Sequence, residues 1–529
     1  MAIVADVDVF IMGSMGAGLA AAARLIDLGH TVAIGDEQPH PGGLLTGGLG
    51  LPDYVGISDA NDTLTGFGRK FFQDCEVAAI ADGAVEGSPE EGDTPAVKGY
   101  GRYHGLPRRY LPEWGRYARD IMLEGTQKFW DIEIAKFDID PVTKLGGIVT
   151  LTDGREIKAK QFLSASYEAQ LGHAAHISYS GGRSENQDTY NEELAGAVSN
   201  GSSEGNGGFD LVHIDAKGNL FNEFQGKQII PARMADLGVM AYNYRMTLSQ
   251  HPLRLPFQPP ARPGGGAFRE ADFESWIVSN GSKMTGLRSI TSGQWTDEYN
   301  ITTNGGSQYG LPREYLRCKN KRERRDFWDL HYYNMAGWYY LAQNSSRMKP
   351  EMLADSALWG LPHNHNVTEY FGQQGWSAHL YIRECFRMNN GNKMTFHDMG
   401  AAVRWTVKEP MGRGGYHCDS HIVAQTVIPG RKYLKDGGME DAVQGGRSYY
   451  QIPFAALKPP RGIIRNMLEI GCPAVTRTVM CSLRMEPTWM SIGEAAALAV
   501  HFALLDNVPV TEVEYQKIAD LATSLEMKI

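Results

Sequence analysis

The hydrophobic positions at the start of the chain form short apolar runs separated by glycine turns. Residues 7–12 make a run of the length of a buried parallel strand, and this run breaks at Gly13. Small and aliphatic residues over 20–28 predict a helix that Gly29 ends. Residues 31–34 are apolar and rich in β-branched side chains, so they predict a second buried strand. The order strand, glycine turn, helix, strand indicates a βαβ unit.

The glycine turn of this unit has the spacing of a dinucleotide-binding loop. Gly13 permits the tight turn, and Gly18 lies where helix and strand pack closely. Asp36 follows the second strand, 18 residues after Gly18, where an acidic residue accepts hydrogen bonds from a ribose. Met15 replaces the middle glycine of the pattern, so an ordinary βαβ turn is the alternative interpretation. We predict that the turn binds a pyrophosphate through Gly13, Ser14, Met15, Gly16, Ala17 and Gly18.

Later segments extend this organisation. A loop with five glycines over 42–50 permits close approach to a flat or charged ligand, and its leucines argue against a flexible linker. Residues 132–166 predict a three-stranded meander whose last strand, 160–165, rejoins the parallel sheet. Helices are predicted over 110–130, 322–343 and 489–505, with Pro487 suited to a first helical turn.

Length and composition suggest more than one domain. The chain has 529 residues, 42% of them hydrophobic and 21% charged, as in globular proteins of two to four domains. Residues 185–455 differ in composition from the rest of the chain, because they are rich in Gly, Asn, Tyr and Trp. We predict a nucleotide-binding domain over 1–184, an inserted substrate domain over 185–455, and a return to the nucleotide-binding domain over 456–529.

Charge and cysteine usage disfavour several classes of protein. The net charge is −10, and the basic run 319–325 is interrupted by Glu323, which favours a solvated helix face over a nucleic-acid site. Six scattered cysteines without a C-x-x-C pair indicate reduced thiols rather than a zinc or iron–sulfur site. Asp6 and Asp8 interrupt the apolar run at the N-terminus, which favours a first strand over a signal peptide. The apolar stretch 495–505 is too short to span a bilayer. We expect a cytoplasmic protein with no membrane, nucleic-acid or metal partner.

Seven segments make the chain resemble the FAD-dependent oxidoreductases of the glutathione-reductase-like superfamily, some of which are called xanthan-lyase-like. They occur in the order of that family. They are the N-terminal βαβ unit, GGLLTGGLG (42–50), SASYEAQLGHAA (164–175), TTNGG (302–306), YIRECFRM (381–388), GGYHCDSHIV (414–423) and SLRMEPTWMSIGEAAALA (482–499).

The resemblance implies an α/β fold, with a discontinuous Rossmann-type FAD-binding domain and an inserted α+β substrate domain. It implies that the loop after the second strand lines the flavin, and that amides of residues 490–493 contact the flavin C2 carbonyl. Ser164 and Ser166 stand where the family has Asp and Thr. The further FAD-binding candidates are Asp36, Glu37, Gly42, Gly43, Leu44, Leu45, Thr46, Gly47, Ala165, Ser166, Glu486, Met490, Ser491 and Gly493.

The segment 415–421 carries the candidate catalytic groups. In an extended conformation His417, Asp419 and His421 project from one face, because strand side chains alternate with period two. An imidazole beside a carboxylate is a base suited to neutral pH. We predict one of the two histidines as the base, with His417 preferred, and Asp419 as its orienting partner. A metal site and purely structural histidines are the alternatives.

Other candidates are of second rank. Arg383 is suited to pair with an acidic group of the substrate, and a surface salt bridge is the alternative. His40 lies near the loop expected to line the flavin, which raises covalent attachment of the flavin as one interpretation, and a simply polar histidine in a turn is the favoured alternative. The remaining polar candidates in this region are His379, Arg387 and His397.

These observations favour oxidation of a hydroxylated small molecule, such as a sugar derivative or polyol, by hydride transfer to flavin N5. Oxygen or a carrier would then reoxidise the flavin. A second NAD(P)H-binding glycine motif is absent from the sequence, which disfavours a reductase with two dinucleotides. A flavin monooxygenase or desaturase acting on a natural product remains an alternative. A flavin-bearing RNA-modification or scaffold subunit is the alternative from a different class, and the oligomeric state is left open.

Overall fold

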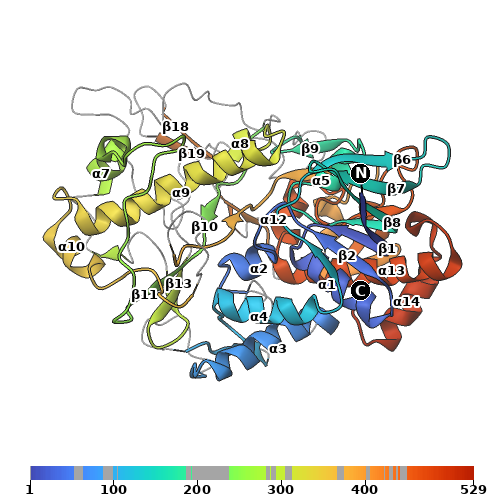
Figure 1. Cartoon of the computed structure of the whole chain (residues 1–529), viewed down its shortest axis with the longest axis horizontal. Helices are drawn as coiled ribbons and strands as arrows, with labels where there is room; N and C mark the ends of the chain where they lie inside the picture. The colour runs from blue at the N-terminus through green and yellow to red at the C-terminus, as the bar shows by residue number, and fades with distance from the viewer. Residues whose placement is uncertain are drawn as a thin grey trace.

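The computed structural model describes the greater part of the chain, and all structural statements concern the residues described. These are 2–52, 64–86, 99–103, 105–185, 192, 237–280, 286–287, 293–303, 312–365, 374–400, 406–421, 423–427, 433–436, 439–440 and 449–529. The large sheet and its helices lie at one end of the molecule, and the long helix α9 crosses the other end (Figure 1).

A seven-stranded sheet organises the nucleotide-binding part. Its order is β5-β2-β1-β8-β7-β6, with β22 also paired to β8. Neighbours among β5, β2, β1, β8 and β22 are parallel, whereas β6, β7 and β8 form an antiparallel meander. The strands are β1 (Ala2–Met12), β2 (Val32–Gly35), β5 (Gln127–Phe129), β6 (Ile134–Ile139), β7 (Gly146–Leu151), β8 (Arg155–Ser164) and β22 (Met467–Glu469).

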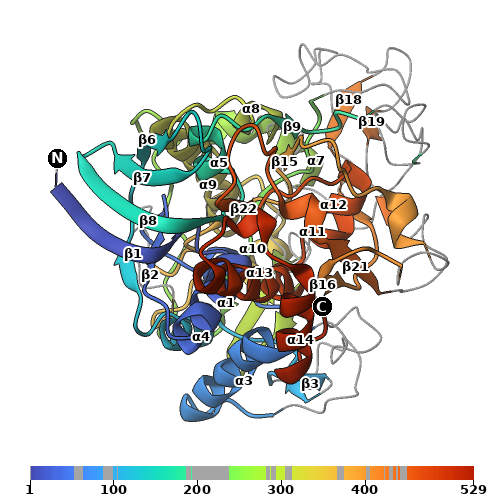
Figure 2. The same ribbon diagram turned by 90° about the vertical axis from the view of Figure 1, so that its right-hand side faces the viewer.

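Strand β8 joins distant parts of the sequence. Its first half pairs with β7, and its last three residues pair with β22, which lies some three hundred residues further along the chain. Figure 2 shows β1, β8, β7 and β6 side by side. The predicted meander and its return to the parallel sheet are confirmed, and a C-terminal segment completes a sheet built mainly by N-terminal strands. The domain limits themselves stay a prediction.

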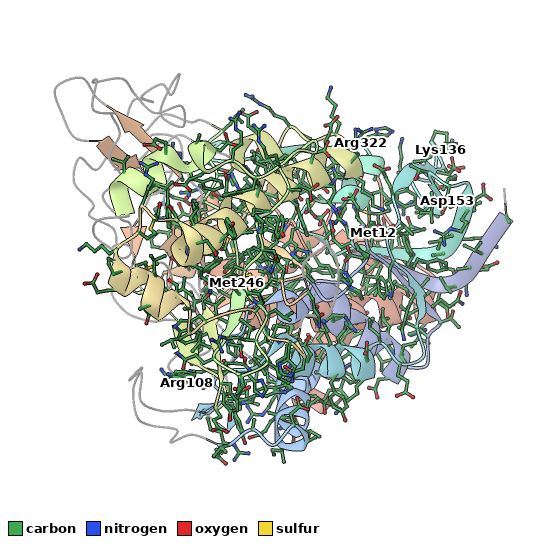
Figure 3. The ribbon with its side chains drawn as sticks, turned by 60° about the vertical axis from the view of Figure 1, so that its left-hand side comes forward. Met12, Arg108, Lys136, Asp153, Met246 and Arg322 are labelled. Atoms are coloured by element: carbon green, nitrogen blue, oxygen red, sulfur yellow. The ribbon has the colours of Figure 1, made fainter. Side chains whose placement is uncertain are left out.

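Strand β1 is buried on both faces where it enters the turn. Val9 and Ile11 belong to the apolar core that contains the helices, whereas Phe10 and Met12 belong to the core beneath the meander. Burial on both faces is typical of a parallel sheet covered by other elements on each side. Met12 lies near the middle of the molecule and Lys136 and Asp153 near its edge (Figure 3), so the turn after β1 begins deep inside the fold.

Helix α1 (Gly16–Asp27) follows this turn, and the α13 helix (Glu486–Asp506) packs along it. A Cβ built on Gly493 would lie 2.0 Å from the carbonyl oxygen of Ala17, so the absence of a side chain sets the distance between the helices. The predicted βαβ order is confirmed. Helix α13 begins three residues earlier than expected, because Pro487 occupies its first turn.

Helix α13 is longer than the apolar stretch 495–505 that the sequence singled out. The helix has 21 residues and is long and apolar enough to cross a membrane, although the apolar stretch 495–505 alone is shorter. About 72% of its most apolar window is nevertheless buried inside the protein, as in a core helix.

The helix predicted over 110–130 is shorter than expected. Helix α4 (Pro112–Met122) ends before Gly125, whose φ of +80° belongs to the left-handed region, and residues 127–129 form edge strand β5 instead. The other helices around the sheet are α2 (Gly43–Gly47), α3 (Gly66–Ala81), α5 (Gln170–Ala174), α11 (Phe454–Leu457), α12 (Arg477–Leu483), η7 (Val510–Glu512) and α14 (Tyr515–Ser524).

The region between residues 237 and 400 has its own apolar core around α9 (Lys321–Asn344), which confirms the helix predicted over 322–343. Asn320 caps this helix by accepting a hydrogen bond from the amide of Glu323. Four large aromatic side chains of this region are buried in its core and do not form an exposed surface. They are Trp328, Tyr339, Trp359 and Trp376. The elements here are β10 (Asn243–Tyr244), β11 (Met246–Ser249), η4 (Glu270–Phe273), α7 (Glu274–Asn280), β12 (Gly293–Trp295), β13 (Asn300–Thr303), α8 (Pro312–Tyr315), α10 (Pro350–Ser356), β14 (Leu380–Tyr381), β15 (Phe386–Met388) and η6 (Phe396–Met399).

Short strand pairs complete the described structure. They are β3 (Arg102–Tyr103) with β4 (Leu106–Pro107), β9 (Tyr179–Gly181) with β15, β16 (Pro410–Gly414) with β21 (Tyr450–Pro453), β17 (Asp419–Ser420) with β20 (Met439–Glu440), and β18 (Ala424–Val427) with β19 (Tyr433–Asp436). Strand β10 pairs with β14, and this pair lies beside the loop that follows β2.

We predict that Gly493→Ala lowers the free energy of unfolding by about 1–3 kcal/mol, because its methyl group would push α13 away from α1. Urea unfolding measures this change. Gly147→Ala is the matched control, since a Cβ at Gly147 meets nothing within 4 Å, and it should change stability by less than about 0.5 kcal/mol. Equal stability of the two variants would show that the helix contact is not close.

Candidate functional site

The turn after β1 is as tight as the sequence predicts. Gly13 has a φ of +108°, and a Cβ there would lie 2.2 Å from the carbonyl oxygen of Ala165. A Cβ on Gly18 would lie 2.1 Å from the carbonyl oxygen of Gly13. Met15 is 1% exposed and belongs to the core under the helices, so its bulk points into the protein. Both glycines are therefore required sterically.

Asp36 lies at the end of β2 and is bound to the turn. Its carboxylate accepts hydrogen bonds from the amide of Ser14 (2.8 Å), from the Ser14 hydroxyl, and from the amide of Gln38 (2.8 Å). The Ser14 hydroxyl oxygen accepts a hydrogen bond from the amide of Gly42 at 2.8 Å. Burial raises the pKa of Asp36, against the effect of these bonds. Asp36, the turn and the start of the second glycine loop thus form one connected unit.

Glu37 has a partner that the sequence did not reveal. Arg324 of α9 donates from Nε to its carboxylate at 2.7 Å and also from Nη2, and both side chains are largely buried. Gln170 donates to the same carboxylate at 3.1 Å. The basic run 319–325 is therefore not simply a solvated face, because one of its arginines binds the nucleotide-binding part. A contact of Glu37 with the cofactor stays a prediction.

Glu486 places a carboxylate at the N-terminus of α1. Its Oε2 accepts a hydrogen bond from the amide of Gly16 at 3.2 Å, and its Oε1 accepts one from the hydroxyl of Tyr167 at 2.6 Å. The amide of Leu44 donates to the Tyr167 hydroxyl oxygen at 3.2 Å. Burial, and then Glu486, raise the pKa of Tyr167, which keeps the phenol protonated. Tyr167 belongs to the segment SASYEAQLGHAA but was not singled out from the sequence.

The amides expected to face the flavin lie inside helix α13. The helix starts at Glu486, so the amides of residues 490–493 lie beyond its first turn and bond to carbonyls four residues earlier. The contact of those amides with the flavin C2 carbonyl stays a prediction, and their hydrogen bonds within the helix disfavour it. Met490 lies against the turn instead, its Cγ being 3.2 Å from a Cβ built on Gly16. The hydroxyl of Ser491 accepts a hydrogen bond from the amide of Arg413 at 3.1 Å.

The second glycine loop, 42–48, contains α2 and rests on the β10–β14 pair. A Cβ on Gly47 would lie 2.3 Å from the Cβ of His379, and one on Gly48 would lie 2.3 Å from the carbonyl oxygen of Arg245. Thr46 donates from its hydroxyl to the carbonyl of Pro41 at 2.7 Å and so closes the loop. The loop therefore lies between the nucleotide turn and the inserted region.

Asp419 and His421 contact each other, as the sequence predicts. His421 Nε2 lies 3.0 Å from Asp419 Oδ2, and Arg484 donates to the same oxygen at 2.7 Å. Arg484 also donates to the hydroxyl of Tyr381 at 2.8 Å. Burial and the positive charges of Arg383 and Arg484 lower the pKa of His421 to about 4, although Asp419 opposes this shift. His421 and Arg484 hold the pKa of Asp419 well below its usual range.

His417 is placed differently. Its ring stacks on Tyr416 with centroids 4.2 Å apart, and the carboxylate of Asp419 binds His421 and Arg484 instead. The geometry therefore favours His421 over His417 as the base. In the described part of the chain, no three His, Cys, Asp or Glu side chains group in a way that would hold a metal ion.

The second-rank candidates have structural surroundings. Arg387 is buried and pairs with Glu185 at 2.9 Å. His379 is buried against Trp328 and Tyr167, and burial lowers its pKa to about 4. Burial and nearby arginines lower the pKa of His40 to about 4 as well. His397 lies on η6.

The sequence matches the model of a protein family described as FAD dependent oxidoreductase over residues 8–522. The chain belongs to this family. FAD is thus its cofactor, and the family is one of oxidoreductase enzymes. Of the seven segments noted above, residues 304–306 and Ile422 lie outside the described residues.

Three solved structures illustrate the chains to which part of this sequence is similar. The halogenase PltM is 19% identical over 32% of this chain and 36% of its own, with a TM-score of 0.23. CabE, an aromatic hydroxylase from angucycline biosynthesis, is 17% identical over 34% of this chain and 35% of its own, with a TM-score of 0.24. T. acidophilum thioredoxin reductase is 17% identical over 30% of this chain and 35% of its own, with a TM-score of 0.17. The matched part spans about a third of each of those chains. No curated protein matches the sequence.

The residues present fit the ADP end of FAD. Gly13 and Gly18 leave no room for side chains at the turn, and Asp36 lies at the end of β2, where a ribose hydroxyl is bound in such units. The amide of Gly16 points to an anion, here the carboxylate of Glu486. Glu486 therefore holds the position at the helix N-terminus that favours a phosphate.

We predict that Glu486→Gln increases the affinity for FAD by roughly 3- to 10-fold, because a neutral amide competes less with a phosphate for the N-terminus of α1. Titration of the apoprotein with FAD, followed by flavin fluorescence, measures the dissociation constant. Glu124→Gln, at an exposed position, is the control and should leave it unchanged. Weaker binding by Glu486→Gln would show that the carboxylate instead accepts a hydrogen bond needed by the bound cofactor.

Proposed function

We propose that this enzyme oxidises a hydroxylated small molecule, such as a sugar derivative or polyol, by hydride transfer to flavin N5. An oxygen molecule or an electron carrier would reoxidise the flavin. The observation that carries this proposal is the pair of His421 and Asp419, which is fixed by Arg484 just before α13. The seven family segments support a place in the glutathione-reductase-like group with xanthan-lyase-like members.

The hydrogen bonds of His421 define its role. A carboxylate only accepts hydrogen bonds, so Nε2 of His421 carries the proton that Asp419 accepts at 3.0 Å. The lone pair of the neutral imidazole is then on Nδ1. In the proposed reaction Nδ1 would accept the hydroxyl proton of the substrate, and bound FAD would supply the acceptor for the hydride, so that the alcohol carbon would become a carbonyl. Asp419 fixes the tautomer and orientation of the ring and is a positioning residue.

The chain connectivity supports a position of His421 beside the cofactor. Arg484, which binds Asp419, ends α12, and Glu486, which binds the amide of Gly16, begins α13. Only Met485 separates Arg484 from Glu486. The link between α12 and α13 therefore binds both Asp419, the partner of His421, and the nucleotide turn. Bound FAD supplies the two-electron acceptor, whereas the chain supplies the base and its orientation.

The cysteines support a cytoplasmic location as part of this proposal. All six are free in the structure, and five of them are buried. Free thiols suit a reducing compartment.

We predict that His421→Asn slows reduction of the flavin by the substrate by roughly 100-fold or more, because the variant lacks the base. Anaerobic stopped-flow absorbance with a panel of sugars, polyols and hydroxy acids measures this rate. His417→Asn is the matched control, since it removes an imidazole from the same segment but not from Asp419. A large loss in His417→Asn with an unchanged rate in His421→Asn would assign the base to His417.

The pH dependence follows from the lowered pKa of His421. A histidine with its pKa lowered to about 4 is neutral, and so able to accept a proton, at every pH well above 4. We predict that the rate of flavin reduction is flat between roughly pH 6 and pH 8 and falls only as the pH approaches that pKa. A rate that halves near pH 6.5, the ordinary pKa of histidine, would contradict the proposed environment.

A further inference from the structure

Three arginines from separate parts of the chain surround one tyrosine ring. The guanidinium carbons of Arg383, Arg245 and Arg484 lie 4.5, 4.8 and 5.9 Å from the centre of the Tyr381 ring. Arg245 follows β10, Arg383 follows β14, and Arg484 ends α12. The tertiary structure therefore gathers three positive charges in the core, next to the second glycine loop.

The cluster contains more positive than negative charge among the groups described. Asp419 is the carboxylate that binds Arg484, and it lowers the local charge by one. Arg383 is 3% exposed and donates from Nη1 to the carbonyl of Ala241, whereas its Nε is buried without a hydrogen-bond partner. Burial, and then the neighbouring Arg245 and Arg484, lower the pKa of Arg383 to about 9. A buried cation with an unused donor is unfavourable unless an anion completes its surroundings.

Four other buried or largely buried arginines among the described residues are neutralised by an acid. Each of four has a carboxylate partner within 3.2 Å: Arg24 with Glu494, Arg324 with Glu37, Arg387 with Glu185, and Arg477 with Glu384. Glu384 directly follows Arg383 in sequence but pairs with Arg477 and with the amide of Met240. These four arginines are thus each matched with an acid, whereas no ion pair of Arg383 occurs within the described residues.

We propose that this arginine cluster binds an anionic group of the substrate, a carboxylate or a phosphate ester. The inference rests on the proposed function and narrows its substrate class to hydroxylated acids or phosphorylated alcohols. The planar fork of a guanidinium matches both kinds of anion, and the free Nε of Arg383 supplies a donor for it. The anion would be anchored at Arg383 while the hydroxyl carbon faces His421. Arg383 lies over the Tyr381 ring, and Arg484 joins the hydroxyl of Tyr381 to Asp419, the partner of His421.

The location of the cluster supports this role. Arg484 donates both to Asp419, the partner of the proposed base, and to Tyr381, the ring at the centre of the cluster. The carbonyl of Arg245 lies against Gly48 of the second glycine loop. The arginines are therefore placed between the loop that the resemblance assigns to the flavin and the proposed base.

Binding of matched probes to the FAD-loaded enzyme tests the proposal. The probes are glucuronate, its methyl ester, glucose 6-phosphate and glucose, and perturbation of the flavin absorbance under anaerobic conditions gives each dissociation constant. We expect at least one anionic probe to bind about 10- to 100-fold more tightly than its neutral analogue, the gain expected of a charged hydrogen-bond pair. Glucuronate against glucose 6-phosphate then distinguishes carboxylate from phosphate.

Variants of Arg383 connect this preference to the cluster. Arg383→Met should abolish the preference for the anionic probe and leave the neutral probes nearly unchanged, and Arg383→Lys should retain part of it. Arg269→Met, an exposed arginine paired with Asp272, is the control and should keep the full preference. If Arg383→Met does not fold with bound flavin, Arg383→Lys and Arg245→Gln provide the same comparison.

Equal binding of the anionic and neutral probes by the unmodified enzyme would overturn the proposal. An equal loss for both kinds of probe in the Arg383 variants would also overturn it, because the charge would then serve the flavin rather than the substrate. These results are distinct from failure of the proposed function, which shows as an unchanged rate of flavin reduction in His421→Asn.

Discussion

The close packing of α1 against α13 is the constraint on which the rest of the structure depends. Helix α1 begins at the nucleotide turn, and α13 begins at the link that carries Arg484 and Glu486. Gly493 has no side chain, so α13 can approach α1 until Gly493 lies directly against the carbonyl oxygen of Ala17. Apart from the buried pair of Arg24 and Glu494 and the hydrogen bond of Glu486 to Gly16, the residues where the helices meet are mostly apolar, and burial away from water stabilises their contact. The N-terminal turn and the C-terminal link are thereby fixed to each other.

This arrangement determines where charges lie in the interior. Glu486 is brought to the amide of Gly16, Glu494 to Arg24, and Glu469 of β22 to the hydroxyl of Tyr179. A buried carboxylate is tolerated when donors satisfy it, and each of these has at least one donor of this kind. The nucleotide-binding part is thus built from two distant pieces of sequence held together by an apolar helix contact and a set of satisfied acids.

Opposing electrostatic effects act on the pKa of His421, which lies beside the link between α12 and α13. Asp419 favours the charged form of His421, whereas burial and two arginines disfavour it, and the pKa falls to about 4. The outcome is a neutral imidazole whose Nε2 is fixed by a carboxylate. The positive charges around Tyr381 therefore have two consequences: they keep the histidine unprotonated, and they attract an anion.

The sequence by itself determined the local parts: the βαβ unit, the meander, α9 and the steric need for Gly13 and Gly18. These depend on periodicity, turn residues and side-chain volume within a few neighbouring positions. It also placed Asp419 beside His421, because residues two apart in an extended segment share a face. Only the tertiary structure decided that Arg324 binds Glu37, that Glu486 reaches Gly16, and that three arginines meet at Tyr381. Apart from Arg383, which lies two residues from Tyr381, those contacts join residues separated by about a hundred positions or more. No local pattern of polarity specifies which distant charges will meet.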